Sequence, residues 1–511
     1  MVEVDSASRC LYFVGVQPKG VSFMRHFLFL LATIAMLGGC TQEHEILVPR
    51  YPRGSGEYST KIQPIFDRSC GGTFCHGGGQ AGFAASLDLT SYDGLMRGSR
   101  FGAVVIAGHP FMSHLVQTLN ATDTTLSPIS SVQMPAGRNP LPPQDLQTIV
   151  NWIRNGARDD NGNMPFPEPR PQGKVFFTSQ SVDLVGVIDR STNVVMRYVT
   201  AGRPLPFNQP PEAPHNVQID EQGAYYYVTL IRGNKLRKYD AATNQLVGEV
   251  VVGTSPAHVV VSADGAKAYV TNFDLTVGRV YVVNTSTMTV TKVITAGNFM
   301  KGTHGARLSH DGRYLYVGSN GTDLLHVIDT RSDSVVAHLP VTPNVPPFGS
   351  FVYKPYQIAV RDDDRFLYVT LNGRGLVSVF ERSGDAFTWR DTIAVGTRPL
   401  QCEVTRDQRY LYVCNQGSGS VSVIDAQLNR LFTTIVSVGQ QPHGIDISED
   451  SRTVYVTCEN VQASEPPHHP IQGSTAPGFL VLIDVGTQAV IKRIEVGGFA
   501  AGVSVTPGKG N

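Results

Sequence analysis

The 511-residue sequence has no excess of charge of either sign. Lys and Arg together number 42, as do Asp and Glu, and charged residues form only 16% of the chain. A balanced and sparse set of charges gives no indication of nucleic-acid binding or of attraction to an anionic membrane surface. A charged partner would therefore need a local patch of one sign.

Cysteine is also scarce, with seven residues in the chain. Cys10 and Cys40 precede the segments that read as folded, which leaves Cys70, Cys75, Cys402, Cys414 and Cys458. So small and odd a set excludes a disulfide framework, although a bond between Cys402 and Cys414 across one hairpin stays open. These two and Cys458 otherwise read as small buried strand residues. Cys70 and Cys75 form a close pair, and a histidine follows it directly.

The apolar run near the N-terminus, from Phe27 to Leu37, is too short to cross a bilayer. It follows Met-Arg-His and precedes Gly-Gly-Cys40, which is the layout of a secretory signal. The stretch Leu37-Gly-Gly-Cys40 resembles the bacterial lipobox. This resemblance implies that residues 1–39 are an upstream extension and signal peptide, and that Cys40 is acylated. We therefore expect a membrane-anchored lipoprotein outside the cytoplasm, in the periplasm or at the surface of a bacterium.

The remaining chain divides into two folded parts. With 51 Gly and 32 Pro, the composition is typical of turn-rich β structure. Residues 40–57 read as a polar spacer, 58–158 as a compact domain, and 159–173 as a Pro-rich, extended linker. Residues 174–511 form a second domain.

The second domain repeats itself with a period of roughly 42 to 52 residues, the range expected for propeller blades. In each repeat, a second strand carries Tyr-Val-Thr or a close variant, beginning at Tyr227, Tyr269, Tyr316, Tyr368, Tyr412 and Tyr455. A third strand then ends in an acid or amide, seen at Asp189, Asp240, Asn284, Asp329, Glu381, Asp425 and Asp484. These seven endings predict seven units of alternating strands.

The two ends of this domain complement each other. The first repeat, from Lys174, lacks its own entering strand, while residues 501–506 read as a spare one. Sharing that strand would close the ring and remove exposed sheet edges. The repeats resemble the YVTN-repeat β-propeller family, which implies an all-β, seven-bladed propeller and says almost nothing about function.

The pair Cys70 and Cys75 with His76 carries the clearest chemistry in the compact domain. Two thiols followed directly by histidine are typical of c-type haem attachment, in which the thiols bond to the haem and the histidine binds the iron. The usual spacing between the cysteines is two residues and here it is four, so a local disulfide or half of a zinc site stays open. A second Cys/His pair within about 20 residues, which zinc would need, is missing.

Two further features suggest the same cofactor. Met134-Pro135 follows, and then Leu146, Ile149, Val150 and Ile153 form one apolar helical face that stops at Gly156. Together with Cys75-His76-Gly-Gly, these landmarks resemble small class I cytochromes c, as found on bacterial lipoproteins. The resemblance implies a small all-α domain with one covalent haem c.

That resemblance also implies a role for each residue. Cys70 and Cys75 would form the haem thioethers, His76 would be the proximal iron ligand, and Met134 would be the distal ligand. The alternative distal ligands are His109, Met112 and His114, or an open or water-bound position.

Histidines also recur in the propeller. His215, His304 and His443 occupy one equivalent position in the entering strands, which line the central channel, and His258 lies one residue away. The other equivalent positions are Ala257, Tyr356, Leu400 and Ala501. Since three histidines from unevenly spaced blades need not meet at one ion, we expect no stoichiometric copper or zinc there. His468-His469 reads as part of a solvated insertion.

These features predict an electron carrier rather than a catalyst. We expect one covalent haem, a redox partner protein that the sequence does not identify, and a propeller that docks or binds. A surface recognition or adhesion propeller with an accessory cytochrome is one alternative. The other is a propeller redox enzyme that passes electrons to the haem, which would need a second cofactor.

Overall fold

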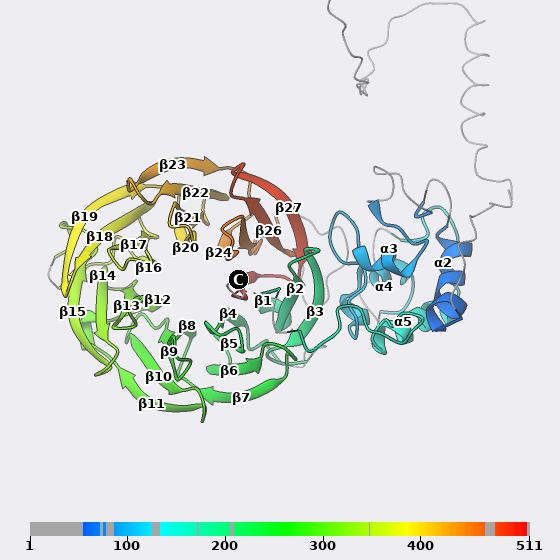
Figure 1. Cartoon of the computed structure of the whole chain (residues 1–511), viewed down its shortest axis with the longest axis horizontal. Coiled ribbons are helices and arrows are strands. Elements are labelled where there is room, and N and C mark those ends of the chain that lie inside the picture. The colour runs from blue at the N-terminus through cyan, green and yellow to red at the C-terminus, as the bar shows by residue number, and fades with distance from the viewer. Residues whose placement is uncertain are drawn as a thin grey trace, which may run out of the picture. The chain divides into compact units, whose positions relative to one another are not determined.

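The computed structural model describes residues 55–71, 75–77, 86–124, 133–170, 173–204, 209–346, 348–465 and 476–507. The predicted signal peptide, the lipidation site Cys40 and the pair His468-His469 lie outside these residues. Figure 1 shows the two kinds of structure that are described, a group of helices and a ring of strands.

The helical segment is built around one apolar core. Its elements are a π-helical turn (Tyr58–Ile62), α2 (Gln63–Ser69), α3 (Tyr92–Arg97), a 3-10 turn (Pro110–Met112), α4 (His114–Leu119) and α5 (Pro143–Arg154). The predicted face of α5 is buried in this core, together with Ile62, Ile65 and Phe66. Just after α5, Gly156 has a φ of +101°, a conformation that favours glycine and ends the helix.

The strands form seven four-stranded antiparallel sheets, so the predicted seven-bladed all-β propeller is confirmed. Blades 1 to 4 contain β1 (Lys174–Ser179), β2 (Leu184–Asp189), β3 (Val194–Thr200) and β28 (Ala500–Val505); β4 (Pro214–Ile219), β5 (Tyr225–Leu230), β6 (Lys235–Asp240) and β7 (Leu246–Val251); β8 (Pro256–Val261), β9 (Lys267–Asn272), β10 (Arg279–Asn284) and β11 (Thr289–Ile294); and β12 (Thr303–Leu308), β13 (Tyr314–Ser319), β14 (Leu324–Asp329) and β15 (Ser334–Pro340). Blades 5 to 7 contain β16 (Pro355–Val360), β17 (Phe366–Leu371), β18 (Leu376–Ser383) and β19 (Ala386–Ala394); β20 (Pro399–Val404), β21 (Tyr410–Asn415), β22 (Ser420–Asp425) and β23 (Arg430–Ile435); and β24 (Pro442–Ile447), β25 (Thr453–Cys458), β26 (Gly478–Asp484) and β27 (Ala489–Val496).

In six blades the strands pair in sequence order, and in blade 1 the order is β28-β1-β2-β3. The first strand of each of blades 2 to 7 lies nearest the centre of the ring, as Figure 1 shows. Val175 of β1 pairs with Val505 of β28, so the last strand of the chain completes the first blade. Closing the ring in this way leaves no unpaired inner edge in that blade.

The tyrosines of the Tyr-Val-Thr motif join neighbouring blades. Their rings are buried between the sheets. Three of their hydroxyls donate to the turn between the third and fourth strands of the next blade: Tyr269 to Asp333 at 2.9 Å, Tyr368 to Asn429 at 2.5 Å and Tyr412 to Gln488 at 2.9 Å. The repeated motif therefore holds one blade to the next as well as filling the core.

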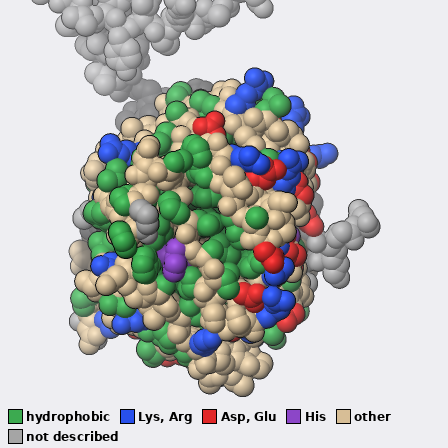
Figure 2. Space-filling model, turned by 90° about the vertical axis from the view of Figure 1, so that its left-hand side faces the viewer, with side chains coloured by type: hydrophobic (Ala, Val, Ile, Leu, Met, Phe, Trp, Pro, Cys, Tyr) green, Lys and Arg blue, Asp and Glu red, His purple; other side chains and the backbone are tan. Residues whose placement is uncertain are grey.

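The outer surface carries charges of both signs. Figure 2 shows one face of the molecule, on which hydrophobic side chains lie among polar ones while acidic and basic side chains lie mixed together along the right-hand edge. This mixing agrees with the zero net charge of the whole chain.

Candidate functional site

The first candidate site lies at the end of α2. The backbone N–H of Cys70 donates to the carbonyl of Phe66 at 2.8 Å, and the N–H of His76 donates back to the carbonyl of Cys70 at 3.3 Å. Cys70 is buried, Cys75 is exposed, and both are free thiols. The loop therefore returns His76 to the helix end from which Cys70 projects.

The imidazole of His76 has a defined tautomer. Its Nδ1 lies 3.4 Å from the carbonyl oxygen of Leu87, which only accepts, so Nδ1 carries the proton and Nε2 keeps its lone pair. Burial lowers the pKa of His76, which favours the neutral ring. A neutral imidazole with a free Nε2 is the form that binds haem iron.

Met134 packs against the same hydrophobic cluster as Cys70. Its backbone N–H donates to the carbonyl of Thr118 at 2.9 Å, which fixes the loop against α4. Burial raises the pKa of the Cys70 thiol to about 11, Cys75 raises it further, and the charge of Arg138, four residues after Met134, lowers it. The methionine loop and the cysteine loop thus lie together, and these residues fit the ligand set of a c-type haem.

The alternative distal ligands lie elsewhere. Met112 packs with Ala103 and Ile106 in a cluster that contains residues of blades 1 and 7, and not in the cluster that contains Cys70. The ring of His109 lies 6.5 Å from that of Tyr198. Of the sulfur candidates, Met134 is therefore the one placed beside the cysteine loop.

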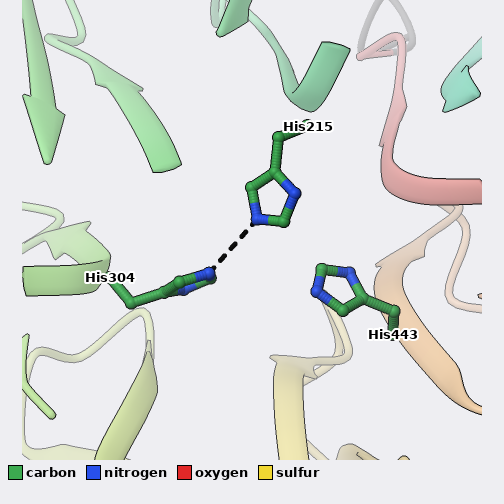
Figure 3. Close-up of side chains that lie close together, drawn as sticks. All are labelled: His215, His304 and His443. Carbon is green, nitrogen blue, oxygen red and sulfur yellow. Dashed lines mark hydrogen bonds between the residues drawn. The ribbon is translucent and has the colours of Figure 1, made fainter. Parts of the chain in front are cut away.

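The second candidate site is in the propeller channel, where the structure brings His215, His304 and His443 together. They are the second residues of β4, β12 and β24, and all three are buried. Nε2 of His215 lies 3.2 Å from Nε2 of His304, and one nitrogen of each ring lies within 4.8 Å of the other two. Figure 3 shows the three rings around a common centre. The expectation that these histidines need not meet was wrong.

The physical reason is a bulge in the inner strands. The register of β4, β12 and β24 against the neighbouring strand shifts directly after the second residue's position, between Pro214 and Val217 and at the equivalent points. A bulge re-aims the side chains beside it. The intervening positions Ala257 and Ala501 are small, which leaves room for three imidazoles in one channel.

The rings of this cluster are oriented by their other nitrogens. Nδ1 of His443 donates to the carbonyl of Ala501 at 3.1 Å, so its Nε2 is an acceptor, and the hydroxyl of Tyr356 donates to it at 3.2 Å. Nδ1 of His215 lies 2.9 Å from the amide of Gln180. The ring of Tyr356 also stacks on His304, with 3.8 Å between the ring centres.

Burial keeps the cluster neutral. It lowers the pKa of His443 to about 4 and those of His215 and His304 well below their usual value. Glu459, whose Oε1 lies 3.7 Å from Nε2 of His443, has its pKa raised to about 8 by burial. Sequence patterns gave no signal for Gln180 or Glu459, because both approach the histidines through the fold and not through the repeat.

His258 is a different case from the three clustered histidines. Its Nε2 lies 3.1 Å from the side-chain amide nitrogen of Gln401 and 3.4 Å from that of Asn216. It lines a cavity of about 400 Å³ together with Arg307, Arg406 and Gln357. His258 therefore separates this cavity from the histidine cluster, and its own ring nitrogen is already engaged by amides.

The remaining predicted residues have structural positions. Cys402 and Cys414 are both free, and they pack in different hydrophobic clusters on the two sides of their sheet, which rules out the bond between them that the sequence left open. Cys458 is buried in the same cluster as Cys414. Among the described residues, no helix has the length and apolar character needed to cross a membrane.

Comparison with known proteins supports the propeller. No curated protein sequence matches the chain. Among solved structures, the Pseudomonas aeruginosa periplasmic gluconolactonase PpgL is 17% identical, with 65% of this chain and 98% of that one covered and a TM-score of 0.50. The dihydro-heme d1 dehydrogenase NirN in complex with DHE is 14% identical (77% and 93% covered, TM-score 0.46), and Kuenenia stuttgartiensis hydrazine synthase is 16% identical (57% and 88%, TM-score 0.44). At such identities the likeness concerns the fold alone.

The family match is carried by the blades. The model of the family described as "Lactonase, 7-bladed beta-propeller" matches residues 174–385 and 340–431, which together span half of the chain. These residues begin at β1 and extend into blade 6. The chain therefore belongs to this family of seven-bladed lactonase-type propellers.

Proposed function

We propose that this protein transfers electrons through one haem c bound covalently by its helical segment. The observation that carries the proposal is the grouping of two free thiols, a neutral imidazole with a free Nε2, and a thioether around one end of the helical core. Such a set is the complete attachment and ligand set of a c-type haem with His/Met ligation.

Each residue would have one task. Cys70 and Cys75 would hold the group by thioether bonds, and His76 and Met134 would supply a nitrogen and a sulfur to the metal. Bound there, the haem supplies one-electron redox chemistry, and the thioether ligand raises its potential. The carbonyl of Leu87 holds the His76 ring in the tautomer that leaves Nε2 free. The apolar core around Cys70 and Met134 limits access of water.

The location and partners form part of the same proposal. Acylation of Cys40 would anchor the protein outside the cytoplasm, where a propeller and a redox domain meet a partner protein. Two or more acyl chains would hold it firmly, whereas one would bind only marginally. Replacing Cys40 with Ser should release the protein from membranes or leave an unprocessed precursor.

The direct test is covalent attachment. The purified full-length protein should give an absorption spectrum that changes on reduction, and denatured protein should keep haem-dependent peroxidase activity. A Cys70→Ala, Cys75→Ala double variant should lose that activity, while Cys402→Ala, a buried propeller cysteine, should keep it. A correctly processed protein without bound haem would overturn the proposal.

Family membership favours one second candidate, hydrolysis of a lactone in the propeller. The cavity of about 400 Å³ has Arg307 and Arg406 in its wall, which suit a substrate that develops negative charge. δ-Gluconolactone opening should then be faster with the protein than without it, and Arg406→Gln should remove the difference. An equal rate with and without the protein would exclude that substrate and leave electron transfer as the function.

A further inference from the structure

The three channel histidines have the arrangement of metal ligands. Nε2 of His215 and Nε2 of His304 face each other at 3.2 Å, and each ring offers one nitrogen within 4.8 Å of the others. A tetrahedral ion with metal–nitrogen bonds of about 2.0–2.1 Å holds its ligand nitrogens about 3.3 Å apart. The first pair already has this spacing, and His443 would have to turn inward by less than the length of one bond.

The protonation of the rings also suits a metal. Because the Ala501 carbonyl fixes the proton of His443 on Nδ1, the Nε2 lone pair of His443 faces the cluster. The Gln180 amide does the same for His215 when its oxygen faces Nδ1, and amide orientation is free to adapt. Without an ion, His215 and His304 must share one proton between two facing nitrogens, and a metal would replace that proton.

The electrostatic surroundings add to this. All three rings are neutral because burial lowers their pKa values, and neutral imidazole is the form that binds metal. The donor set contains nitrogen without carboxylate oxygen, so it does not suit calcium or magnesium. Glu459 and Tyr356 lie beside His443, where they would face the ion from outside the three ligands.

We propose that His215, His304 and His443 bind a divalent transition-metal ion of the zinc–copper class in the propeller channel. Imidazole is a preferred ligand of both ions. Three protein ligands leave one coordination position open, as in catalytic rather than structural zinc sites. The cavity lined by His258 gives a route to the site, because the rings of His258 and His304 lie 5.7 Å apart.

The site also joins three blades. His215, His304 and His443 lie in blades 2, 4 and 7, so the ligands come together only in a closed ring. Such a site is independent of the haem proposal, since it shares no residue with the cysteine loop.

Zinc titration of the full-length protein tests the site. After removal of metal with a chelator, calorimetry and elemental analysis should show one more zinc ion per chain in the wild type than in the His215→Ala, His304→Ala, His443→Ala variant. Single variants His304→Gln and His443→Gln should bind that ion at least tenfold more weakly. His258→Gln is the matched control, because it removes a buried channel histidine outside the cluster, and it should bind like the wild type.

Two further measurements guard the result. A His468→Ser, His469→Ser variant should keep the channel zinc, which separates the site from that histidine pair. If the triple variant does not fold, added zinc should still raise the Tm of the wild type and of His258→Gln but not of His304→Gln. Equal zinc binding in the wild type and in both single variants, or no tight binding in the wild type, would overturn the proposal. Elemental analysis of untreated protein would show whether copper or zinc occupies the site.

Discussion

The backbone N–H of Thr506 donates a hydrogen bond to the carbonyl of Lys174, 3.0 Å away, across a separation of 332 residues. The hydroxyl of Thr506 accepts a further bond from the N–H of Lys174 at 3.0 Å. These contacts lie at the end of the β1–β28 pairing that completes blade 1. The last strand is thus as much a part of the first blade as the strands that precede it in sequence.

Removing that strand should unfold the ring. A chain ending at residue 499 would leave β1 with an unpaired inner edge, which promotes aggregation. We expect loss of soluble protein or a large fall in the unfolding temperature, measured by circular dichroism. A chain ending at Pro507 keeps β28 and serves as the control. A stable, monomeric 1–499 chain would contradict this role of the strand.

Met134→Ala should change the proposed haem without removing it. The covalent bonds to Cys70 and Cys75 do not depend on the sixth ligand, so haem content should stay near that of the wild type. The reduction potential should fall, because thioether ligation raises it. Potentiometry with Met112→Ala as the control separates the two methionines, and a fall in the Met112 variant alone would move the ligand to Met112.

His310 should make stability depend on pH. Its Nε2 lies 2.9 Å from Asp362 and its Nδ1 3.5 Å from Asp364, and these carboxylates raise the pKa of His310 from 6.5 to about 9. The folded protein therefore binds this proton more tightly than the unfolded chain. The stabilisation is complete below about pH 6.5 and is lost as the pH rises through about 9.

The size of this effect is limited by solvent. The side chain of His310 is 35% exposed, so the free energy of unfolding should fall by only about 1 kcal/mol in His310→Gln at pH 6. The difference from the wild type should vanish above pH 9 in urea titrations. Asp362→Asn should lose most of the same pH dependence, and a pH-independent difference would refute the ion-pair explanation.

Asp323 should be among the residues most sensitive to substitution. Its buried carboxylate accepts backbone N–H bonds from Val352 at 2.6 Å, Tyr353 at 3.0 Å and Lys354 at 2.6 Å. Asp323→Ala would leave these donors unpaired and should lower the free energy of unfolding by about 3 kcal/mol. Asp323 has a φ of +56°, which Asn also tolerates, so Asp323→Asn should lose less. Equal losses would assign the effect to the backbone conformation.

The repeat pattern was enough to predict the blades. The seven acidic or amide endings lie at or near the ends of the third strands, and the α5 face of Leu146, Ile149, Val150 and Ile153 is buried. Both results rest on local periodicity, which a sequence displays directly. The cytochrome-like character of the helical segment, the haem and the lipid anchor stay predictions, because they depend on a cofactor and a modification.

The channel site needed the structure. Alternation along β4, β12 and β24 does not reveal a bulge, and the bulge directs the second residue of each strand toward the other histidines. The opposite facing of Cys402 and Cys414 has the same origin, since the register of β20 also shifts between Pro399 and Cys402. Period-2 reasoning fails wherever one extra residue changes the phase of a strand.

The tyrosine contacts between blades all run in one direction around the ring. The hydroxyl of Tyr269 reaches forward to Asp333, and that of Tyr368 reaches forward to Asn429. A substitution in such a turn would thus loosen the blade before it and leave its own sheet intact. Damage in this propeller would spread backwards along the chain, from each turn to the preceding tyrosine.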